Sequence, residues 1–303
     1  MKIIITGSEG FIGKKLKSYF EKEDLYFIDN RLDDENSICL NNEKKLKTFF
    51  KNIDDFFLIH CAALRNDFGF DYEDYFLNNV TATENLLRVI DEKKIKKFIH
   101  ISSVASIDGK TLIEKKLFTK NSDDHYRKTK YLQESLVEDW AKKNKVSYVI
   151  LAPSAIYDEE SRLDTNIGKL KVYAKYLPLI PLIEEKKSLT NLSNFVLFIK
   201  FFLNNSVNHN KYICIDRPVK STSDIIQNSL KNKKVVIYIP FLKQVLMILS
   251  LLLSVLSFGG RIDTVFTYGR YKKLYKDTSY ADQNIYDDSL YNNFFNNEQN
   301  KIQ

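Results

Sequence analysis

The sequence is poor in the residues that break or crosslink a chain. Its 303 residues include only 9 glycines, 5 prolines and 3 cysteines. The cysteines, Cys39, Cys61 and Cys214, are far apart and form no CxxC or Cys/His cluster, which argues against a zinc site and a disulfide framework. We therefore expect no bound metal. Because the first residues already form an apolar strand, no secretion signal is expected, and a cytoplasmic location is the default.

The sequence also lacks a block of charge of one sign. The formal net charge of +7 comes from lysines spread along the whole chain. No basic run alternates with aromatic residues as a nucleic-acid groove requires, so we expect no nucleic-acid partner. The hydrophobic content of 44% predicts a globular chain with one or two domains.

Because glycine is scarce, three glycines close together near the N-terminus are informative. Lys2–Thr6 is an isoleucine-rich apolar run typical of a strand buried on both faces. Gly7, Gly10 and Gly13 follow at three-residue spacing, and a helical pattern begins there. A strand, a glycine turn and a helix N-terminus together favour binding of a dinucleotide pyrophosphate. An ordinary glycine turn before a helix is the alternative.

A second strand is followed by an acidic residue. Asp29 comes after the apolar run Leu25–Ile28, about 20 residues beyond the glycines. A carboxylate there can accept hydrogen bonds from both ribose hydroxyls of an adenosine and would repel a 2′-phosphate, which favours NAD over NADP. Arg31 is close enough in sequence that binding of NADP stays an alternative. For Asp29 the alternative interpretation is an ordinary turn residue after a strand.

Two more apolar strands end in small or hydroxyl-bearing residues. Three small residues follow Phe56–His60, and the run that ends at Ile101 is followed by Ser102 and Ser103. Small side chains leave room for a flat ligand against the backbone. Hydroxyls at the carboxyl ends of parallel strands point toward the ligand crevice of such sheets.

A tyrosine and a lysine one helical turn apart are candidates for proton transfer. Tyr126 and Lys130 share a face of a predicted helix. A phenol with a pKa of about 10 is a poor base at neutral pH, but a neighbouring ammonium stabilises the phenolate. Tyr126 could then exchange protons with an alcohol or ketone, with the Ser103 hydroxyl on the same oxygen. A solvated helix face is the usual explanation of YxxxK, but here it follows the other motifs in the required order.

These motifs together resemble the extended short-chain dehydrogenase/reductases, specifically the NAD-dependent nucleotide-sugar epimerase/dehydratase group. The resemblance is carried by TGSEGFIG (Thr6–Gly13), IDNR (Ile28–Arg31), IHCAAL (Ile59–Leu64), NNVTATENLL (Asn78–Leu87), ISS (Ile101–Ser103), YRKTK (Tyr126–Lys130) and LAPSAIYD (Leu151–Asp158).

The resemblance implies a set of site residues in this sequence. The catalytic residues would be Ser103, Tyr126 and Lys130. The cofactor-binding residues would be Gly7, Gly10, Phe11, Ile12, Gly13, Asp29, Asn30, Arg31, Cys61, Ala62, Ala63, Arg65, Asn79, Ser102, Tyr126, Lys130 and Pro153.

The resemblance also implies an α/β architecture with two domains. A Rossmann-type doubly wound parallel sheet would take residues 1–153, with residues 190–216 returning to the sheet. A smaller C-terminal α/β substrate-binding domain would take residues 154–189 and 217–303.

The function that the resemblance implies is NAD-dependent 4-epimerisation of a nucleoside-diphosphate sugar, UDP-linked, through a transient 4-keto sugar. Synthesis of surface polysaccharide precursors would be its setting. An NAD(P)H-dependent 4-keto-sugar nucleotide reductase and a non-catalytic dinucleotide-binding regulatory protein are the alternatives. Dehydratases of this group carry Asp-Glu after the strand-end hydroxyl; here Val104 and Ala105 follow Ser103, which disfavours elimination. The family pattern LRPxxxYG is also altered, with Ala152 and Asp158 in place of its arginine and last glycine.

The uncharged stretch 244–260 has apolar residues all round a predicted helix. It is slightly shorter than the ~20 residues that span a bilayer. Three interpretations stay open: a buried helix of the small domain, a helix that docks on a membrane surface or a partner, and a membrane span. Assembly of the chain into a homodimer is a further open alternative.

Overall fold

The computed structural model describes most of the chain and divides it into two units. The described residues are 1–30, 38–65, 70–91, 93–117, 122–158, 174–176, 178–206, 210–228, 230, 233–256, 278 and 280. The described residues up to 156 and from 190 to 215 form the first unit, and those of 157–189 and 216–282 form the second.

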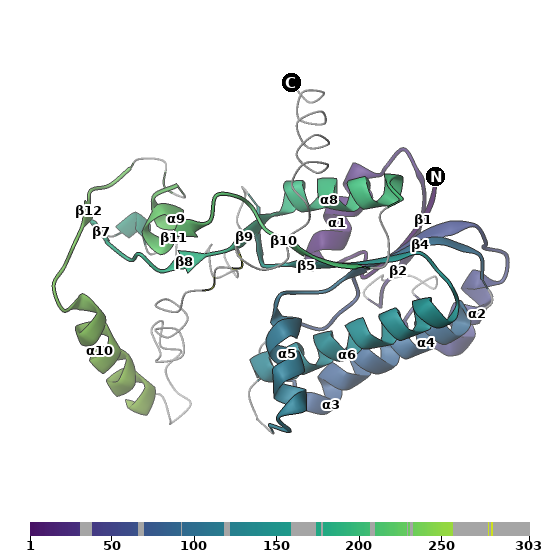
Figure 1. Ribbon diagram of the computed structural model, residues 1–303, viewed down its shortest axis with the longest axis horizontal. Helices are drawn as coiled ribbons and strands as arrows, with labels where there is room; N and C mark the ends of the chain where they lie inside the picture. The colour runs from purple at the N-terminus through teal and green to yellow at the C-terminus, as the bar shows by residue number, and fades with distance from the viewer. Residues whose placement is uncertain are drawn as a thin grey trace. The chain divides into compact units, whose positions relative to one another are not determined.

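A six-stranded parallel sheet is the centre of the first unit (Figure 1), in the order β10-β5-β4-β3-β1-β2. Because β1 lies inside the sheet, with β2 on one side and β3 on the other, the strand order reverses at β1, as in doubly wound folds. The predicted fold class is therefore confirmed. The strands are β1 (Lys2–Thr6), β2 (Asp24–Ile28), β3 (Phe56–His60), β4 (Ile95–Ile101), β5 (Tyr148–Pro153) and β10 (Asn210–Cys214).

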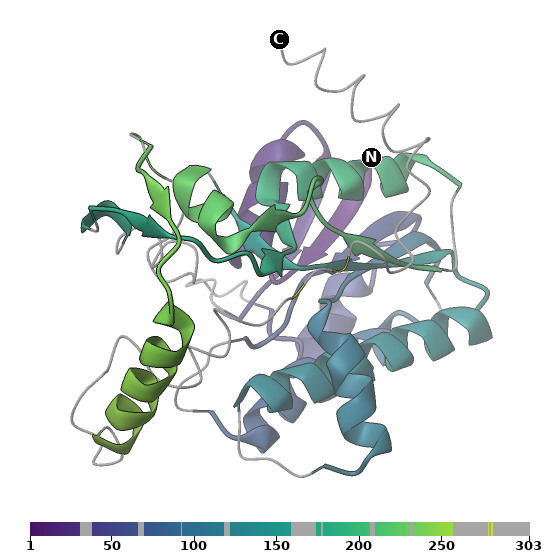
Figure 2. The same cartoon turned by 60° about the vertical axis from the view of Figure 1, so that its left-hand side comes forward.

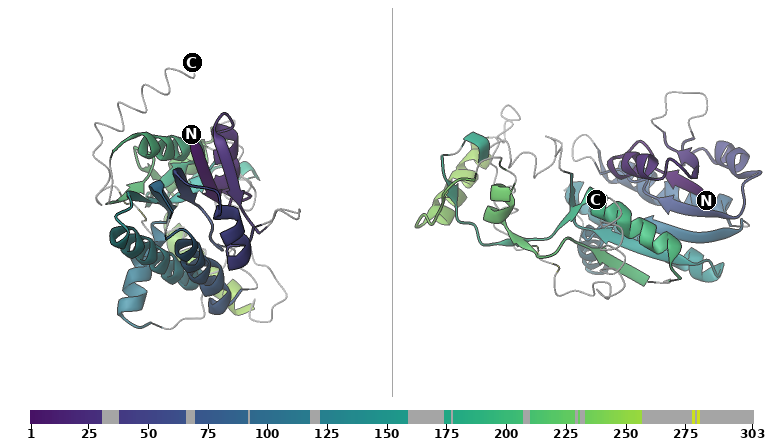
Figure 3. Two further views of the ribbon diagram at one scale, coloured as in Figure 1. Left: turned by 90° about the vertical axis from the view of Figure 1, so that its right-hand side faces the viewer. Right: turned by 90° about the horizontal axis from the view of Figure 1, so that it is seen from above.

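Helices cover both faces of this sheet (Figures 1 and 3). Alternate residues of β1 face opposite ways: Ile3 and Ile5 pack in a core with α1 and α8, whereas Ile4 packs in a core with α2, α4 and α6. The helices are α1 (Phe11–Tyr19), α2 (Glu43–Phe50), α3 (Tyr72–Tyr75), the π-helical segment η1 (Phe76–Thr81), α4 (Ala82–Val89), α5 (Ala105–Glu114), α6 (Ser122–Lys143) and α8 (Leu192–Asn204).

The second unit is built from short elements. Its small buried cluster contains Ala174, Ile180 and Ile226. β7 pairs with β12 and β8 with β11, and the chain leaves and re-enters the first unit through the paired strands β6 and β9. The elements are β6 (Ala155–Tyr157), β7 (Ile180–Pro181), β8 (Lys186–Lys187), β9 (Leu189–Asn191), β11 (Lys220–Ser221), α9 (Thr222–Asn228), β12 (Val236–Ile237) and α10 (Leu242–Leu256).

The helix α10 contains most of the uncharged stretch singled out in the sequence (Figure 2). Its side chains Val245, Ile248 and Leu252 are about half exposed, whereas Ser250 is fully buried. The interpretation of this stretch as a buried helix is therefore wrong for the residues up to 252, because most of the described apolar side chains of α10 are exposed. Among the described helices, none has the length and apolar content needed to cross a membrane. Residues 257–260 lie outside the described part of the chain.

Candidate active site

The glycine turn after β1 is a place where the backbone comes close to neighbouring backbone. Gly7 has a φ of +68°, and a Cβ there would lie 2.8 Å from the backbone of Ala62. A Cβ on Gly13 would lie 2.3 Å from the carbonyl oxygen of Gly7. The left-handed φ at Gly7 and the close backbone packing at both positions require glycine.

The N-terminus of α1 fits an anionic group. Its N-cap is Gly10, which has no side chain to bond the N–H groups of the first turn, formed by Phe11, Ile12 and Gly13. That turn contains no acidic residue, so the positive end of the helix dipole is left for a ligand. In the glycine turn that precedes α1, the buried hydroxyl of Ser8 has no hydrogen-bond partner among the described residues. The residues present therefore fit a pyrophosphate, and Ser8 is a candidate contact that the glycine spacing did not reveal.

Asp29 is connected directly to this turn. Its carboxylate is 5% exposed, and Oδ2 accepts a hydrogen bond of 2.8 Å from the N–H of Glu9. The acid at the end of β2 is thus held beside the glycine turn. Asn30 follows it and is exposed, while Arg31 lies outside the described residues.

A buried polar chain links the carboxyl ends of β1 and β3 to α4. The hydroxyl of Thr6 is 2.6 Å from Nδ1 of His60, and Nε2 of His60 is 2.9 Å from the hydroxyl of Thr83. Because the Thr83 hydroxyl donates to the carbonyl of Asn79 (2.6 Å), we assign the His60 proton to Nε2. Burial, and secondarily the charge of Lys130, lowers the pKa of His60 to about 3. His60 is therefore neutral and structural.

The segment after β3 is held by Asn79. Oδ1 of Asn79 accepts a 2.6 Å hydrogen bond from the N–H of Leu64, and its amide donates to the carbonyl of Leu64 and to the hydroxyl of Thr129 on α6. The fully buried side chain thus shapes the segment expected to line the dinucleotide. Direct contact of Asn79 with a cofactor stays a prediction.

The residues of that segment differ in exposure. Burial raises the pKa of the Cys61 thiol to about 12, so it is neutral. Ala62 is half-buried against Gly7, and Ala63 and Arg65 are exposed. A small-residue surface beside the turn is consistent with a flat ligand.

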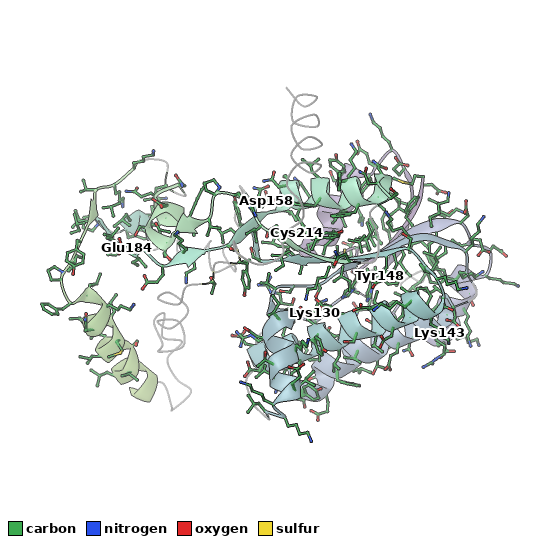
Figure 4. All side chains as sticks on the ribbon, viewed as in Figure 1. Lys130, Lys143, Tyr148, Asp158, Glu184 and Cys214 are labelled. Carbon is green, nitrogen blue, oxygen red and sulfur yellow. The ribbon has the colours of Figure 1, made fainter. Side chains whose placement is uncertain are left out.

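Lys130 belongs to α6, and its side chain reaches the end of β4 (Figure 4). Its ammonium is 1% exposed and donates to the carbonyl of Ile101 at 2.9 Å and to Oε1 of Gln133 at 2.6 Å. Tyr126 is half-buried one helical turn earlier, and Ser103 is half-buried two residues beyond Ile101. The structure therefore brings the predicted lysine to the strand end that carries the predicted serine.

Burial makes the charge of Lys130 titratable near neutral pH. Desolvation lowers its pKa from 10.5 to about 8, the carboxylate of Glu134 and the thiol of Cys61 oppose this, and Lys211 adds to it. The ammonium is thus present at pH 7 and is lost at moderately alkaline pH. Such a group can stabilise a phenolate one turn away.

The other strand-end residues face the protein. The hydroxyl of Ser102 is buried and donates to the carboxylate of Glu134 on α6. Pro153 ends β5, and its carbonyl accepts a 3.1 Å hydrogen bond from the N–H of Val104. Contacts of Ser102 and Pro153 with a cofactor stay predictions. Glu134 was not identified from the sequence, although it lies one turn beyond Lys130 on the same helix face.

The pH dependence of stability should reveal the buried ammonium. Between pH 8 and 10.5 the unfolded chain holds a proton on Lys130 that the folded protein releases, so this group makes stability rise with pH through that window. We expect the free energy of unfolding of Lys130→Met, relative to wild type, to fall as pH rises from 8 to 10, by at most roughly 1 kcal/mol per pH unit. Urea unfolding at pH 7 to 10 measures it. Lys143→Met, at the exposed end of α6, is the control, and parallel curves for Lys130→Met and wild type would contradict the assignment.

Comparison with known proteins gives the family. A family model described as the NAD dependent epimerase/dehydratase family matches residues 3–176. The chain is 30% identical over 143 residues to the GDP-6-deoxy-D-talose 4-dehydrogenase of Aggregatibacter actinomycetemcomitans, a match that covers 46% of this chain and 48% of that protein. The chain spans about half the length of the curated relatives it matches.

Two solved structures share the fold. The UDP-glucuronic acid 4-epimerase from Bacillus cereus in complex with NAD has a TM-score of 0.59 at 21% identity, covering 79% of this chain and 86% of that chain. The dTDP-4-dehydrorhamnose reductase from Bacillus anthracis in complex with NADP also has a TM-score of 0.59, at 19% identity, covering 78% of this chain and 84% of that chain. Because the family model spans more than half of the sequence, from β1 past the Tyr126–Lys130 pair, the chain belongs to the NAD dependent epimerase/dehydratase family.

Proposed function

We propose that the protein is an NAD-dependent 4-epimerase of a nucleoside-diphosphate sugar, acting through a transient 4-keto sugar. The observation that carries the proposal is the buried Lys130 ammonium at the end of β4, one turn from Tyr126 and beside the strand end that bears Ser103. The Bacillus cereus structure is a UDP-glucuronic acid 4-epimerase, and the curated relative acts on a GDP-linked sugar by its name. These comparisons support a nucleotide sugar, and the former favours a UDP-linked one.

The side chains of this chain would move one proton during the reaction. A bound nicotinamide dinucleotide would supply reversible acceptance of a hydride from the sugar carbon. Tyr126 takes the proton of the C4 hydroxyl, and the Lys130 ammonium stabilises the phenolate that does so. The Ser103 hydroxyl donates to the same sugar oxygen. For an epimerase, the keto sugar turns over within the site before Tyr126 returns the proton.

A 4-keto-sugar nucleotide reductase is the second candidate. The Bacillus anthracis structure with the same fold is a dTDP-4-dehydrorhamnose reductase, and the curated relative is named a 4-dehydrogenase. The same Tyr126, Lys130 and Ser103 would serve this reaction, with Tyr126 donating the proton. Their joint presence argues against a third candidate, a non-catalytic dinucleotide-binding protein.

Removal of the Tyr126 hydroxyl should abolish most of the activity. We expect Tyr126→Phe to lower kcat by about 10²- to 10⁴-fold, because a positioned general acid/base contributes that much. The assay follows UDP-glucose, UDP-N-acetylglucosamine and UDP-glucuronic acid by chromatography, with and without NADH. Tyr131→Phe, on the next turn of α6, is the matched control and should keep wild-type kcat.

The same assay separates the candidates. Conversion of a UDP-sugar without net change of cofactor supports the epimerase. Oxidation of NADH only in the presence of a 4-keto sugar supports the reductase. If Tyr126→Phe has wild-type kcat in either reaction, the proposed mechanism is wrong.

Asp29 should set the preference for NAD. Its carboxylate is fixed beside the phosphate-binding turn, where it would accept from the ribose hydroxyls and repel a 2′-phosphate. We expect Asp29→Asn to weaken NAD binding and to reduce the preference for NAD over NADP by about tenfold, on the basis of one lost charged hydrogen bond. Calorimetric titration of both dinucleotides measures the ratio. Asp24→Asn, at the exposed start of β2, is the control; an unchanged ratio in Asp29→Asn would refute the role.

We also propose that α10 contacts an anionic membrane surface. The helix contacts the rest of its unit through an ion pair of 2.8 Å between Lys243 and Glu185, and its Ser250 is buried. The opposite face exposes Val245, Ile248 and Leu252. Between Asp224 and Asp263 the sequence has lysines and an arginine but no acidic residue, a charge pattern that suits anionic lipid.

Vesicle flotation tests this contact. We expect the wild-type protein to float with vesicles that contain phosphatidylglycerol and less with vesicles of phosphatidylcholine alone. Leu252→Glu should reduce flotation several-fold, because a charge enters the apolar face, whereas Leu117→Glu changes an exposed leucine of the first unit and should not. Equal flotation of Leu252→Glu and wild type, or no flotation of wild type, would rule the contact out.

A further inference from the structure

The loop that carries Ser103 is fastened to α6 by one carboxylate. Ser102, at the start of this short loop, and Ser106, in the first turn of α5, both donate to Oε1 of Glu134, the latter at 2.7 Å. Glu134 lies one turn beyond Lys130 on α6 and is 6% exposed. The same helix therefore holds the loop of Ser103 and carries Tyr126 and Lys130.

The second oxygen of this carboxylate is also occupied. Lys211, on the edge strand β10, donates to Oε2 of Glu134 at 2.8 Å and to the hydroxyl of Ser106 at 2.8 Å. The carboxylate thus has a cationic partner and two hydroxyl donors, which is the condition for burying a charge without a large penalty. The Ser106 hydroxyl also lies 2.8 Å from the carbonyl oxygen of Ser103 itself.

We propose that Glu134 is a positioning residue that fixes Ser103 relative to Tyr126, and that Lys211 holds Glu134 in place. The inference rests on the proposed function, because it assigns Ser103 and Tyr126 to one sugar oxygen. The backbone of the loop is bonded to β5 through Ser102 and Val104, so the strand end is anchored without Glu134. What the carboxylate adds is a link between the loop and the helix that carries the proton-transferring phenol.

The same pair suggests a test that does not alter net charge. Glu134→Gln combined with Lys211→Met keeps an oxygen that accepts from Ser102 and Ser106. Glu134→Leu combined with Lys211→Met removes that oxygen and fills the space with apolar groups. Replacement of a buried ion pair by apolar residues of similar volume is often neutral or stabilising, so both double variants should fold.

The first readout does not need a substrate. The protein is labelled with ¹³C at Cζ of its 18 tyrosines, and the signal of Tyr126 is assigned by its absence in Tyr126→Phe. The titration of this NMR signal with pH reports how well Ser103 and Lys130 face the phenol. We expect Tyr126 of the Glu134→Gln/Lys211→Met variant to titrate as in the wild type. In the Glu134→Leu/Lys211→Met variant we expect Tyr126 to titrate about one pH unit higher, because its phenolate loses a hydrogen-bond donor. Glu138→Ala, one turn further along α6, where Glu138 pairs with Lys142, should not shift the titration.

The second readout is kinetic, with each rate expressed per NAD-binding site. The Glu134→Leu/Lys211→Met variant should lose on the order of 100-fold in kcat, as for a misplaced catalytic group, with KM within threefold of wild type. The Glu134→Gln/Lys211→Met variant should have the kcat of the wild type. A merely structural role of Glu134 would lower the melting temperature without changing either readout.

The outcomes separate this inference from the proposed function. If no nucleotide sugar is converted by the wild-type protein, the proposed function fails, and the Tyr126 titration still decides the role of Glu134. If both double variants titrate as wild type, the positioning role is wrong, whatever the wild-type activity.

Discussion

Burial of the Lys130 ammonium is the constraint that the rest of the site depends on. An unpaired buried charge is very costly, so each neighbour must either solvate it or be neutral. The carbonyl of Ile101 and the amide oxygen of Gln133 solvate it directly. Burial keeps His60 and Cys61 uncharged, so neither alters the local charge at neutral pH. Lys130 therefore carries the positive charge at this strand end at neutral pH.

The same constraint explains why the polar network extends so far from Tyr126 and Lys130. Gln133 must present its oxygen to Lys130, so its NH₂ group has to donate elsewhere, and it reaches the hydroxyl of Thr83 at 2.9 Å. Thr83 in turn fixes His60 and the carbonyl of Asn79. Each of these buried groups has a partner in the next, so the orientation of one side chain constrains that of the next. The strand ends are therefore held before any ligand arrives.

Local signals in the sequence were sufficient for the sheet and for the residues at its carboxyl ends. The run Lys2–Thr6 with its three glycines, and the spacing of Tyr126 and Lys130, are short-range patterns whose physical meaning does not depend on distant residues. Glu134 and Lys211 could not be found in this way, because they are 77 residues apart and meet only once β10 joins the sheet. The helix α10 shows the converse limit. Its apolar composition predicted a helix, but composition alone cannot say which face has a protein partner.

Asp29 shows how one side chain can serve the fold and a ligand together. A carboxylate has about four acceptor sites, so the bond from Glu9 that shapes the turn leaves capacity for hydroxyl donors of a ribose. Because this bond and the left-handed Gly7 fix the turn in advance, binding of a dinucleotide need not order the loop. Glu134 follows the same principle at the other strand ends, where it orders the Ser103 loop against α6. In both places a buried carboxylate accepts hydrogen bonds that fix a loop at the carboxyl end of a strand, and these bonds are formed within the protein itself.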